Sequence, residues 1–201
     1  MQSVNAKGTY ELLDLSGVFN NDGISYDSNR SDGSFDTWGG TYPAEELPPS
    51  HEVVNRRAIP FLFPDKSDGR CNNVALGGEV IRVPPLCYES LYILGSSEMG
   101  SFRDVLSLNY ANGRREKRMF SLSEFFCRKA YFGDIAALEC DHFHVPDRDI
   151  RWFEAPGRAR ARVKARLWLQ RIECNGLDAL ETILFPDNPC MHVFCISLRL
   201  R

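Results

Sequence analysis

The stretch that decides the fold is VLSLNYANGRREKRMFSL, residues 105–122. Apolar and polar residues alternate from Val105 to Tyr110, and a second run with strand character returns from Lys117 to Leu122. A period of two is typical of a strand with one buried face, and Asn-Gly between two such runs is the strongest local hairpin signal. The Asn112-Gly113 pair therefore predicts an antiparallel β-hairpin.

Short runs of the same kind recur along the chain, separated by glycine, proline and Asx residues that are typical of turns. The 201 residues, 43% of them hydrophobic, are enough to bury one core, so we expect a single domain over residues 1–201. Many short strands and almost no helix predict an all-β fold, a two-sheet antiparallel β-sandwich or jelly roll. The further strands that we predict cover Gly8–Leu15, Ile59–Pro64, Val80–Val83, Tyr88–Gly95, Glu139–Val145, Arg158–Ile172, Thr182–Phe185 and Met191–Leu200.

Two of these strands rest on local chemistry. The strand Val80–Val83 is expected to end at Pro84-Pro85, because proline cannot donate to a β-ladder. Residues 158–172 are good helix formers, yet basic residues recur there at every second position, which favours a long strand with one wet face. We expect this basic stripe to be solvated and to prevent edge pairing, with binding of an anion or an acidic partner as the alternative. The stripe consists of Arg158, Arg160, Arg162, Lys164 and Arg166.

Composition argues against several functional classes. The formal net charge of −3 argues against nucleic acid as a partner, because non-specific binding needs Lys and Arg on phosphates. No stretch approaches the roughly 20 apolar residues that cross a bilayer, and the N-terminal sequence MQSVNAKGTYELLDL lacks a secretory apolar run. Seven cysteines at irregular spacings are typical of free thiols in a reducing compartment. We therefore expect a soluble cytoplasmic protein with no membrane partner.

A long loop with neither helix nor strand character runs from Phe19 to Glu45 and reads FNNDGISYDSNRSDGSFDTWGGTYPAE. It holds four Asp and three Asn among glycines and isolated aromatic residues. Such a composition is typical of consecutive turns. A short helical turn is expected after Tyr42, because Pro48-Pro49 would stop it at once.

Several stretches in the same order resemble one known module. The loop, followed by IPFLFP (59–64), NNVALGGEVIRVP (72–84) and LYILGSSEMGSFRDVLSLNYANG (91–113), resembles a β-sandwich module attached to bacterial and fungal glycoside hydrolases. Those enzymes include family 38 alpha-mannosidases and alpha-fucosidase-like enzymes. The closing MHVFCISL (191–198) resembles the last strand of the module. The resemblance implies a sandwich that recognises a sugar or polyol, while the glycosidic chemistry belongs to a separate domain.

The loop supplies the residue types of a carbohydrate site. Asp and Asn side chains bind the adjacent hydroxyls of a sugar, and an aromatic ring covers its apolar face. The isolated rings of Trp38 and Tyr42 are the stacking candidates. The alternative is that these Asx residues only stabilise their own turns. The predicted ligand-binding residues are Asn20, Asn21, Asp22, Asp27, Asp36, Trp38, Tyr42 and Glu45.

A calcium site is a further interpretation of the loop. Asp27, Asn29 and Asp32 supply oxygen at a spacing that resembles the start of a calcium loop. The glycine that follows is one place late and no glutamate stands at the twelfth position, so an EF-hand is excluded. We expect no cofactor other than this calcium ion.

Proton-transfer chemistry needs ionisable groups, and two sets are candidates. Cys140, His142 and His144 would share one face of a strand, as in the metal sites of some jelly-roll enzymes, although an exposed or hydrogen-bonded His pair is the simpler interpretation. The loop carboxylates, including Glu45-Glu46, could form an acid/base pair. If the protein is an enzyme, the predicted catalytic residues are Asp22, Asp36, His142 and His144.

Three functional hypotheses follow from these patterns. The first is a non-catalytic module that binds a carbohydrate-like ligand. The second is a small cofactor-independent enzyme that isomerises or cyclises a small metabolite, in a biosynthetic pathway for example. The third is an interaction domain that pairs with a larger hydrolase or with itself.

Overall fold

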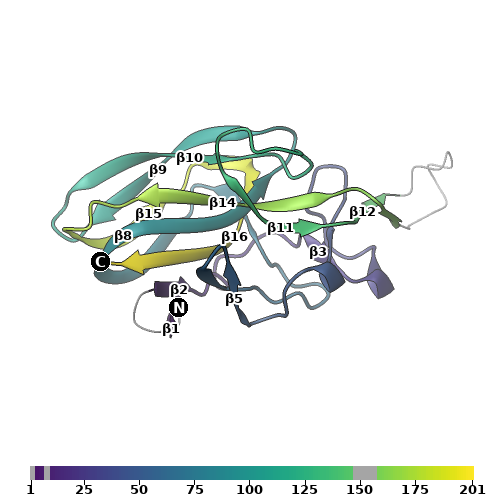
Figure 1. Ribbon diagram of the computed structural model, residues 1–201, viewed down its shortest axis with the longest axis horizontal. Coiled ribbons are helices and arrows are strands. Elements are labelled where there is room, and N and C mark those ends of the chain that lie inside the picture. The colour runs from purple at the N-terminus through teal and green to yellow at the C-terminus, as the bar shows by residue number, and fades with distance from the viewer. Residues whose placement is uncertain (1–2, 7–9, 147–157) are drawn as a thin grey trace.

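A computed structural model describes residues 3–6, 10–146 and 158–201 of the chain (Figure 1). Most strands in these ranges join one ten-stranded sheet whose pairs are antiparallel. The sheet folds over into two layers that face each other across a hydrophobic core. The protein is therefore an all-β sandwich, as the strand pattern predicts.

The first layer runs in the order β1-β2-β16-β8-β14-β11, with β7 paired to the start of β16. The second layer runs in the order β8-β15-β9-β10. The first layer contains β1 (Ser3–Ala6), β2 (Tyr10–Leu13), β7 (Val74–Gly77), β8 (Val80–Ser97), β11 (Ile135–Cys140), β14 (Ala165–Glu173) and β16 (Asp187–Leu200). The second adds β9 (Phe102–Tyr110), β10 (Arg115–Leu122) and β15 (Ala179–Leu184).

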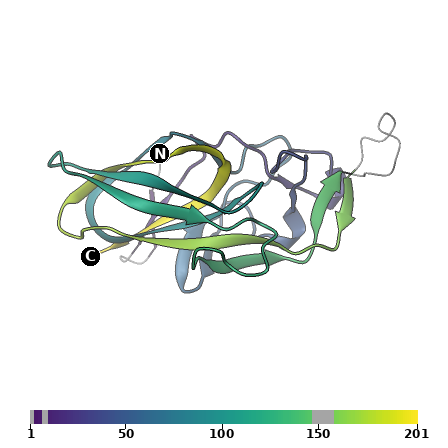
Figure 2. The same cartoon turned by 90° about the horizontal axis from the view of Figure 1, so that it is seen from above.

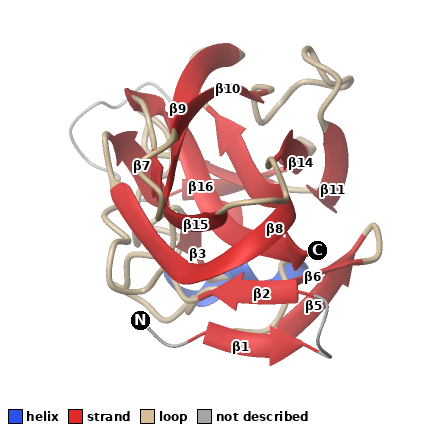
Figure 3. Ribbon diagram, turned by 90° about the vertical axis from the view of Figure 1, so that its left-hand side faces the viewer, coloured by secondary structure: helices blue, strands red, loops and turns tan. Residues whose placement is uncertain are grey.

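Strand β8 belongs to both layers, and Figure 3 shows how strongly it bends. Its first half pairs with β15 and its second half pairs with β14 and β16. The predicted end at Pro84-Pro85 is wrong, because the partner strand β15 shifts its register there, between Leu180 and Thr182. The two prolines lie in a bulge of β8, where Val83, Pro84 and Pro85 face the single residue Glu181 of β15, so the ladder does not need their missing N–H donors.

The predicted hairpin at Asn112-Gly113 is confirmed as β9 and β10. Gly113 has a φ of 82°, which glycine adopts without strain, and its N–H donates to the carbonyl of Tyr110. Along β9, buried Leu106, Leu108 and Tyr110 alternate with residues that face solvent. The core between the two layers consists of such inward-facing residues from both sheets.

Two predicted strands are interrupted. The segment Glu139–Val145 divides into β11 and β12 (Phe143–Pro146), because the backbone N–H groups of Asp141 and His142 turn away to donate to Glu46. The segment Arg158–Ile172 divides into β13 (Arg158–Ala161) and β14 at a tight turn in which Val163 N–H donates to Ala161. The predicted first strand is β2, and its residues Gly8 and Thr9 lie outside the described ranges.

A third layer covers the outer face of the first sheet. It is built from the Phe19–Glu45 loop, from the pair β5 (Val53–Arg56) and β6 (Ile59–Leu62), and from the β12–β13 pair that Figure 2 shows at one end. This layer encloses a second hydrophobic core, with Phe35, Tyr42, Phe61, Phe143 and Phe194 nearly or fully buried. The loop itself contributes the parallel pair β3 (Ile24–Ser25) and β4 (Tyr42–Pro43) and the 3₁₀ turns η1 (Asp27–Asn29) and η2 (Ala44–Glu46).

The short turn η2 confirms the helical turn expected after Tyr42. Helical structure in the described ranges is limited to η1 and η2, and neither is long or apolar enough to cross a membrane.

Candidate ligand-binding site

The turn from Asp36 to Gly40 presents a tryptophan to solvent. Asp36 Oδ1 accepts hydrogen bonds from the backbone N–H groups of Trp38 (3.0 Å) and Gly40 (2.7 Å), which is an Asx turn. Gly39 has a φ of 82°, and its N–H donates to the carbonyl of Asp36 (2.9 Å). Phe35 on one side of this turn is 1% exposed, whereas Trp38 is 59% exposed. Phe35 therefore anchors the turn in the core, and the turn holds the indole of Trp38 exposed at the surface.

A pocket of about 390 Å³ lies beside this turn. Asp36, Trp38 and Gly40 line one side, and Phe126 with Val145 and Pro146 of β12 line the other, together with Ala159 and Ala161 of β13 and Val163. Asp36 is the ionisable residue of this lining, Trp38 carries an indole N–H, and the remaining side chains are apolar. A pocket of this size, with few polar groups, is typical of small-molecule sites.

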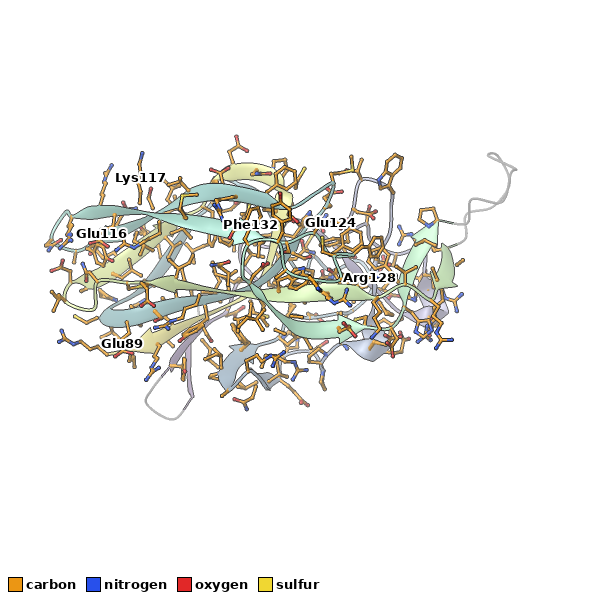
Figure 4. The ribbon with its side chains drawn as sticks, turned by 45° about the horizontal axis from the view of Figure 1, so that its top comes forward. Glu89, Glu116, Lys117, Glu124, Arg128 and Phe132 are labelled. Carbon is orange, nitrogen blue, oxygen red and sulfur yellow. The ribbon has the colours of Figure 1, made fainter. Side chains whose placement is uncertain are left out.

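Two further carboxyl groups surround Asp36. Burial raises the pKa of Asp36, and the charge of Glu98 raises it further. Burial also raises the pKa of Glu124, with Asp36 as an additional charge. Figure 4 shows Glu124 just beyond the end of β10, away from Glu116 and Lys117 at the hairpin end. Both raised pKa values favour a protonated, hydrogen-bond-donating carboxyl group at lower pH.

Glu98 has the opposite shift. Burial acts to raise its pKa, but His192 and the Thr37 N–H outweigh burial and hold the pKa below its ordinary value. The Thr37 N–H donates to Glu98 Oε2 at 2.5 Å, and His192 Nε2 lies 3.8 Å from Oε1. Neighbouring carboxyl groups whose pKa values move apart are the arrangement that acid/base catalysts use.

A second polar cluster joins the loop to β12. Ser25 Oγ lies 2.8 Å from His144 Nδ1, and His144 Nε2 lies 3.2 Å from Asp27 Oδ1. This order of hydroxyl, imidazole and carboxylate is that of a catalytic triad, but Ser25 and His144 are fully buried. Ser25 Oγ is also 2.5 Å from Thr41 Oγ1. Burial lowers the pKa of His144, so the imidazole is neutral at pH 7 and serves to hold the loop on β12.

Ion pairs complete this cluster toward the surface. Arg160 donates to both Asp27 and Glu46, and Glu46 Oε1 lies 2.6 Å from His142 Nδ1. Glu45 accepts a hydrogen bond from the Asp27 N–H at 2.9 Å. The structure thus brings Asp27, Glu45, His142 and His144 together, but each of them already has a partner within the protein.

Only Arg162 and Lys164 of the basic stripe are exposed to solvent. Arg158 donates to the carbonyls of Arg30 (2.9 Å), Asp32 (2.5 Å) and Gly33 (2.5 Å) and so binds the loop to β13. Arg166 is buried, donates to the Cys127 carbonyl at 2.8 Å and pairs with Glu139. The prediction of one continuous wet face is therefore wrong for Arg158, Arg160 and Arg166, because the strand breaks and these side chains meet acidic groups and carbonyls.

A third group of predicted residues lies at the start of the loop. Asn20 bonds the N–H and the carbonyl of Ala75, both at 2.8–2.9 Å, and Asn21 bonds the Ser34 carbonyl and Asn73. Asp22 Oδ1 accepts from Asn72 Nδ2 at 2.6 Å. These contacts add to the backbone bridge between Asn21 and Asn73 and hold the loop against the start of β7, which is the turn-stabilising alternative for these residues.

Tyr42 does not offer a stacking surface. Its side chain is fully buried, its ring packs against Phe35, Phe143 and Phe194, and its hydroxyl donates to the Arg166 carbonyl at 2.9 Å. The stacking role predicted for Tyr42 is therefore wrong. The local sequence around a tyrosine among glycines does not distinguish a ring that is buried in a core from a ring that faces a ligand.

The three residues of the predicted calcium site have different partners. Asp27 pairs with arginines, Asn29 donates to Asp68, and Asp32 accepts from the Gly69 N–H at 2.8 Å. In the part of the chain that the structure describes, no group of three or more His, Cys, Asp or Glu side chains is arranged to hold a metal ion. Calcium binding stays a prediction.

Replacing Asp22 by asparagine is expected to stabilise the protein at pH 7. Burial, aided by the charge of Asp32, raises the pKa of Asp22 to about 6. This folded pKa exceeds the unfolded value of about 3.9, so the contribution of Asp22 is fully present below about pH 4 and is lost as pH rises through 6. Asparagine keeps the acceptor for Asn72 without the buried charge. We expect a gain of about 1–2 kcal/mol at pH 7 and none at pH 4, measured by urea unfolding.

The control for this measurement is Asp187→Asn, at an exposed carboxylate. Its stability curve should follow that of the wild type at every pH. A gain for Asp22→Asn that is the same at pH 4 and pH 7 would contradict the assigned protonation.

Sequence reasoning found Asp36 and Trp38 but missed Glu98, Glu124 and Phe126. Glu98 directly follows the buried run YILGSS at the end of β8, and a carboxylate at the end of a core strand is a signal that could have identified it. Phe126 carries no such signal, because its position depends on how the segment after β10 folds back over β12.

Comparisons with known proteins place the chain at family level. No curated protein matches the sequence. The family model described as the AziU2-like beta-sandwich domain matches residues 9–200, which is nearly the whole chain. The protein therefore belongs to the family of AziU2-like beta-sandwich domains.

Proposed function

We propose that the protein is a ligand-binding β-sandwich and that the pocket beside Trp38 receives a carbohydrate-like ligand. The observation that carries the proposal is the Asp36–Gly40 turn, which holds a 59% exposed indole beside a pocket that both Trp38 and Asp36 line. A binding site needs an aromatic surface and a hydrogen-bonding group in fixed relative positions, and one turn supplies both here.

A sugar ring suits this combination of groups. Its C–H face is apolar and would lie on the indole, while its hydroxyl groups would donate to Asp36. The backbone N–H groups of Trp38 and Gly40 both donate to Oδ1, which leaves Oδ2 outside the turn. The apolar wall of Phe126, Val145 and Val163 favours a ligand with at least one apolar edge over a fully hydroxylated one.

Replacing Trp38 by alanine, or Asp36 by asparagine, is expected to weaken sugar binding about tenfold or more, because each removes one half of the recognition. A glycan array first identifies the sugar, and isothermal titration calorimetry with and without calcium then gives the affinities. Asparagine at position 36 still accepts the two turn hydrogen bonds, so this variant tests the charge alone.

The matched control is Tyr131→Ala, which removes an aromatic ring that is 74% exposed outside the pocket. Its sugar affinity should equal that of the wild type. Absence of sugar binding under both conditions, or full binding by Trp38→Ala, would overturn the proposal.

A second candidate function is cofactor-independent proton transfer on the bound ligand. The observation that favours it is the opposite pKa shift of the neighbouring Asp36 and Glu98 beside an apolar pocket. Asp36 would exchange a proton with the ligand, since it lines the pocket. In the binding experiment above, ¹H NMR of the identified ligand would then show conversion with the wild type and none with Asp36→Asn.

The resemblance to modules of glycoside hydrolases extends the proposal to partners. Association with such a hydrolase, or with a second copy of the chain, stays a prediction. The pocket beside Trp38 would remain the ligand site in either assembly.

A further inference from the structure

A second pocket, of about 420 Å³, lies between the end of β2 and the end of β6. One wall is the segment from Leu13 to Phe19 that follows β2. The opposite wall is formed by Leu62–Asp65 at the end of β6 and by Gly69–Cys71. None of these residues lines the pocket beside Trp38.

The floor of this second pocket is apolar. Leu13 and Leu15 come from the core between the two sheets, whereas Phe63 and Phe194 come from the core under the third layer. All four are at most 3% exposed. The pocket therefore lies where the two cores meet, and the partly exposed side chains of Phe19 and Leu62 offer an apolar body a surface above this floor.

The rim carries charges of both signs. Asp65 is held below its ordinary pKa first by the Ser67 N–H and also by the nearby charges of His51 and Arg70, so it is ionised at neutral pH. Asp14 provides a second carboxylate, whose Oδ1 accepts the Ser16 N–H at 2.9 Å. Within the described ranges, no hydrogen bond or ion pair at contact distance holds the Arg70 guanidinium, which is therefore available to a ligand.

The backbone at the rim is held in an uncommon conformation. His51 has a φ of 61°, in the left-handed region that non-glycine residues seldom adopt. Its N–H donates to Phe63 (3.1 Å), and its Nε2 lies 3.7 Å from Asp65 Oδ2. Such conformations persist where surrounding structure enforces them, and they gather at binding sites. Here the conformation places an imidazole beside Asp65 at the mouth of the pocket.

We propose that this pocket binds a small zwitterion, a molecule with an ammonium group, a carboxylate group and an apolar body. The positive charge of Arg70 would repel a ligand that carries only a positive charge. The negative charges of Asp14 and Asp65 would repel a ligand that carries only a negative charge. A zwitterion places its carboxylate on Arg70 and its ammonium group on the carboxylates, while its body covers Phe19 and Leu62. This site is independent of the sugar pocket proposed above.

Three probes with the same phenyl body test the proposal: L-phenylalanine, 2-phenylethylamine and 3-phenylpropanoate. They carry both charges, only the ammonium group and only the carboxylate. Titrations followed by ¹H–¹⁵N NMR should give an affinity for phenylalanine about tenfold or more above that of either other probe, because each charge-assisted bond contributes. The shifted resonances should include Arg70 and Cys71.

Variants locate the binding. Arg70→Gln should reduce phenylalanine affinity about tenfold and leave phenylethylamine affinity unchanged or higher. Ser16→Trp should abolish binding of all three probes by filling the pocket. Arg82→Gln, which removes an exposed arginine on β8, should change nothing.

Two results would overturn the proposal. One is the absence of phenylalanine binding at about 10 mM, well above the roughly millimolar dissociation constants of weak small-molecule sites. The other is equal affinity for the three probes, which would mean that only the apolar floor binds. Failure of sugar binding at the Trp38 pocket would leave both measurements unaffected.

Discussion

Replacing Phe35 by alanine is expected to lower the free energy of unfolding by about 3–5 kcal/mol, the cost of removing a buried phenyl ring. The ring is 1% exposed and lies at the centre of the core under the third layer. Its centroid is 4.5 Å from that of His192, 4.9 Å from Tyr42 and 5.3 Å from Phe125. An effect of this size would show that a loop rich in Asp and Gly folds as part of the core.

The matched control is Trp38→Ala, three residues away in the same loop. Because the indole is 59% exposed, we expect a loss below about 1 kcal/mol. Urea unfolding followed by far-UV circular dichroism gives both values, and the melting temperature of Phe35→Ala should fall by about 10 °C. Equal losses for the two variants would contradict the division of the loop into a buried anchor and an exposed ring.

The strand pattern predicts most of the fold because alternation is a local property. The β9–β10 hairpin follows from a period of two and an Asn-Gly turn, both of which are decided within 18 residues. The continuity of β8 through Pro84-Pro85 is different. It depends on pairing with β15, about a hundred residues later, which leaves the two prolines in a bulge of β8, and no local rule reports what a distant partner strand does.

The break after Cys140 also depends on a distant residue. Glu46 accepts the N–H groups of Asp141 and His142, so a carboxylate from the third layer replaces a β-ladder. In the sequence, Glu46 is only a charged residue after a short turn. A side chain that accepts a hydrogen bond from a backbone N–H in place of a neighbouring strand cannot be identified from the sequence, because the contact exists only in the folded chain.

The sequence predicts only those residues of the candidate site that lie close together along the chain. Asp36 and Trp38 are two residues apart, and one Asx turn sets their geometry, so composition alone identifies them. Glu98 and Phe126 reach the same place from the ends of β8 and β10. Their approach depends on sandwich packing, which sequence spacing does not encode.

The polar residues of the Phe19–Glu45 loop have two roles, which are to hold the loop against the sheet and to line a ligand pocket. The same residue types serve both roles. Asn20, Asn21 and Asp22 use their polar groups to bond the sheet edge, and Asp27 forms ion pairs with Arg160 and Arg30. Asp36 combines both roles, since one oxygen holds the turn while the carboxyl group lines a pocket. The mutational cost at Asp36 should therefore appear in affinity, and that at Phe35 in stability.

Replacing Gly40 by alanine is expected to destabilise the protein by about 2–3 kcal/mol, the usual cost of overpacking a filled core. A Cβ atom at this position would lie 2.3 Å from Phe143 Cε1 and 3.1 Å from the His144 carbonyl. Phe143 cannot retreat easily, because its ring is fully buried against Tyr42, Phe125 and Phe126. The turn that holds Trp38 would have to move outward, so ligand affinity at the pocket should fall together with stability.

Two comparisons separate this mechanism from a general effect of losing glycine. Gly17→Ala adds a Cβ with no atom within 4 Å and should leave stability unchanged or raise it by up to about 1 kcal/mol. Phe143→Leu makes room at the contact, so Gly40→Ala should cost about 1 kcal/mol less in that background than in the wild type. Additive losses in this double-mutant cycle would mean that Gly40 is needed for its backbone conformation and not for its contact with Phe143.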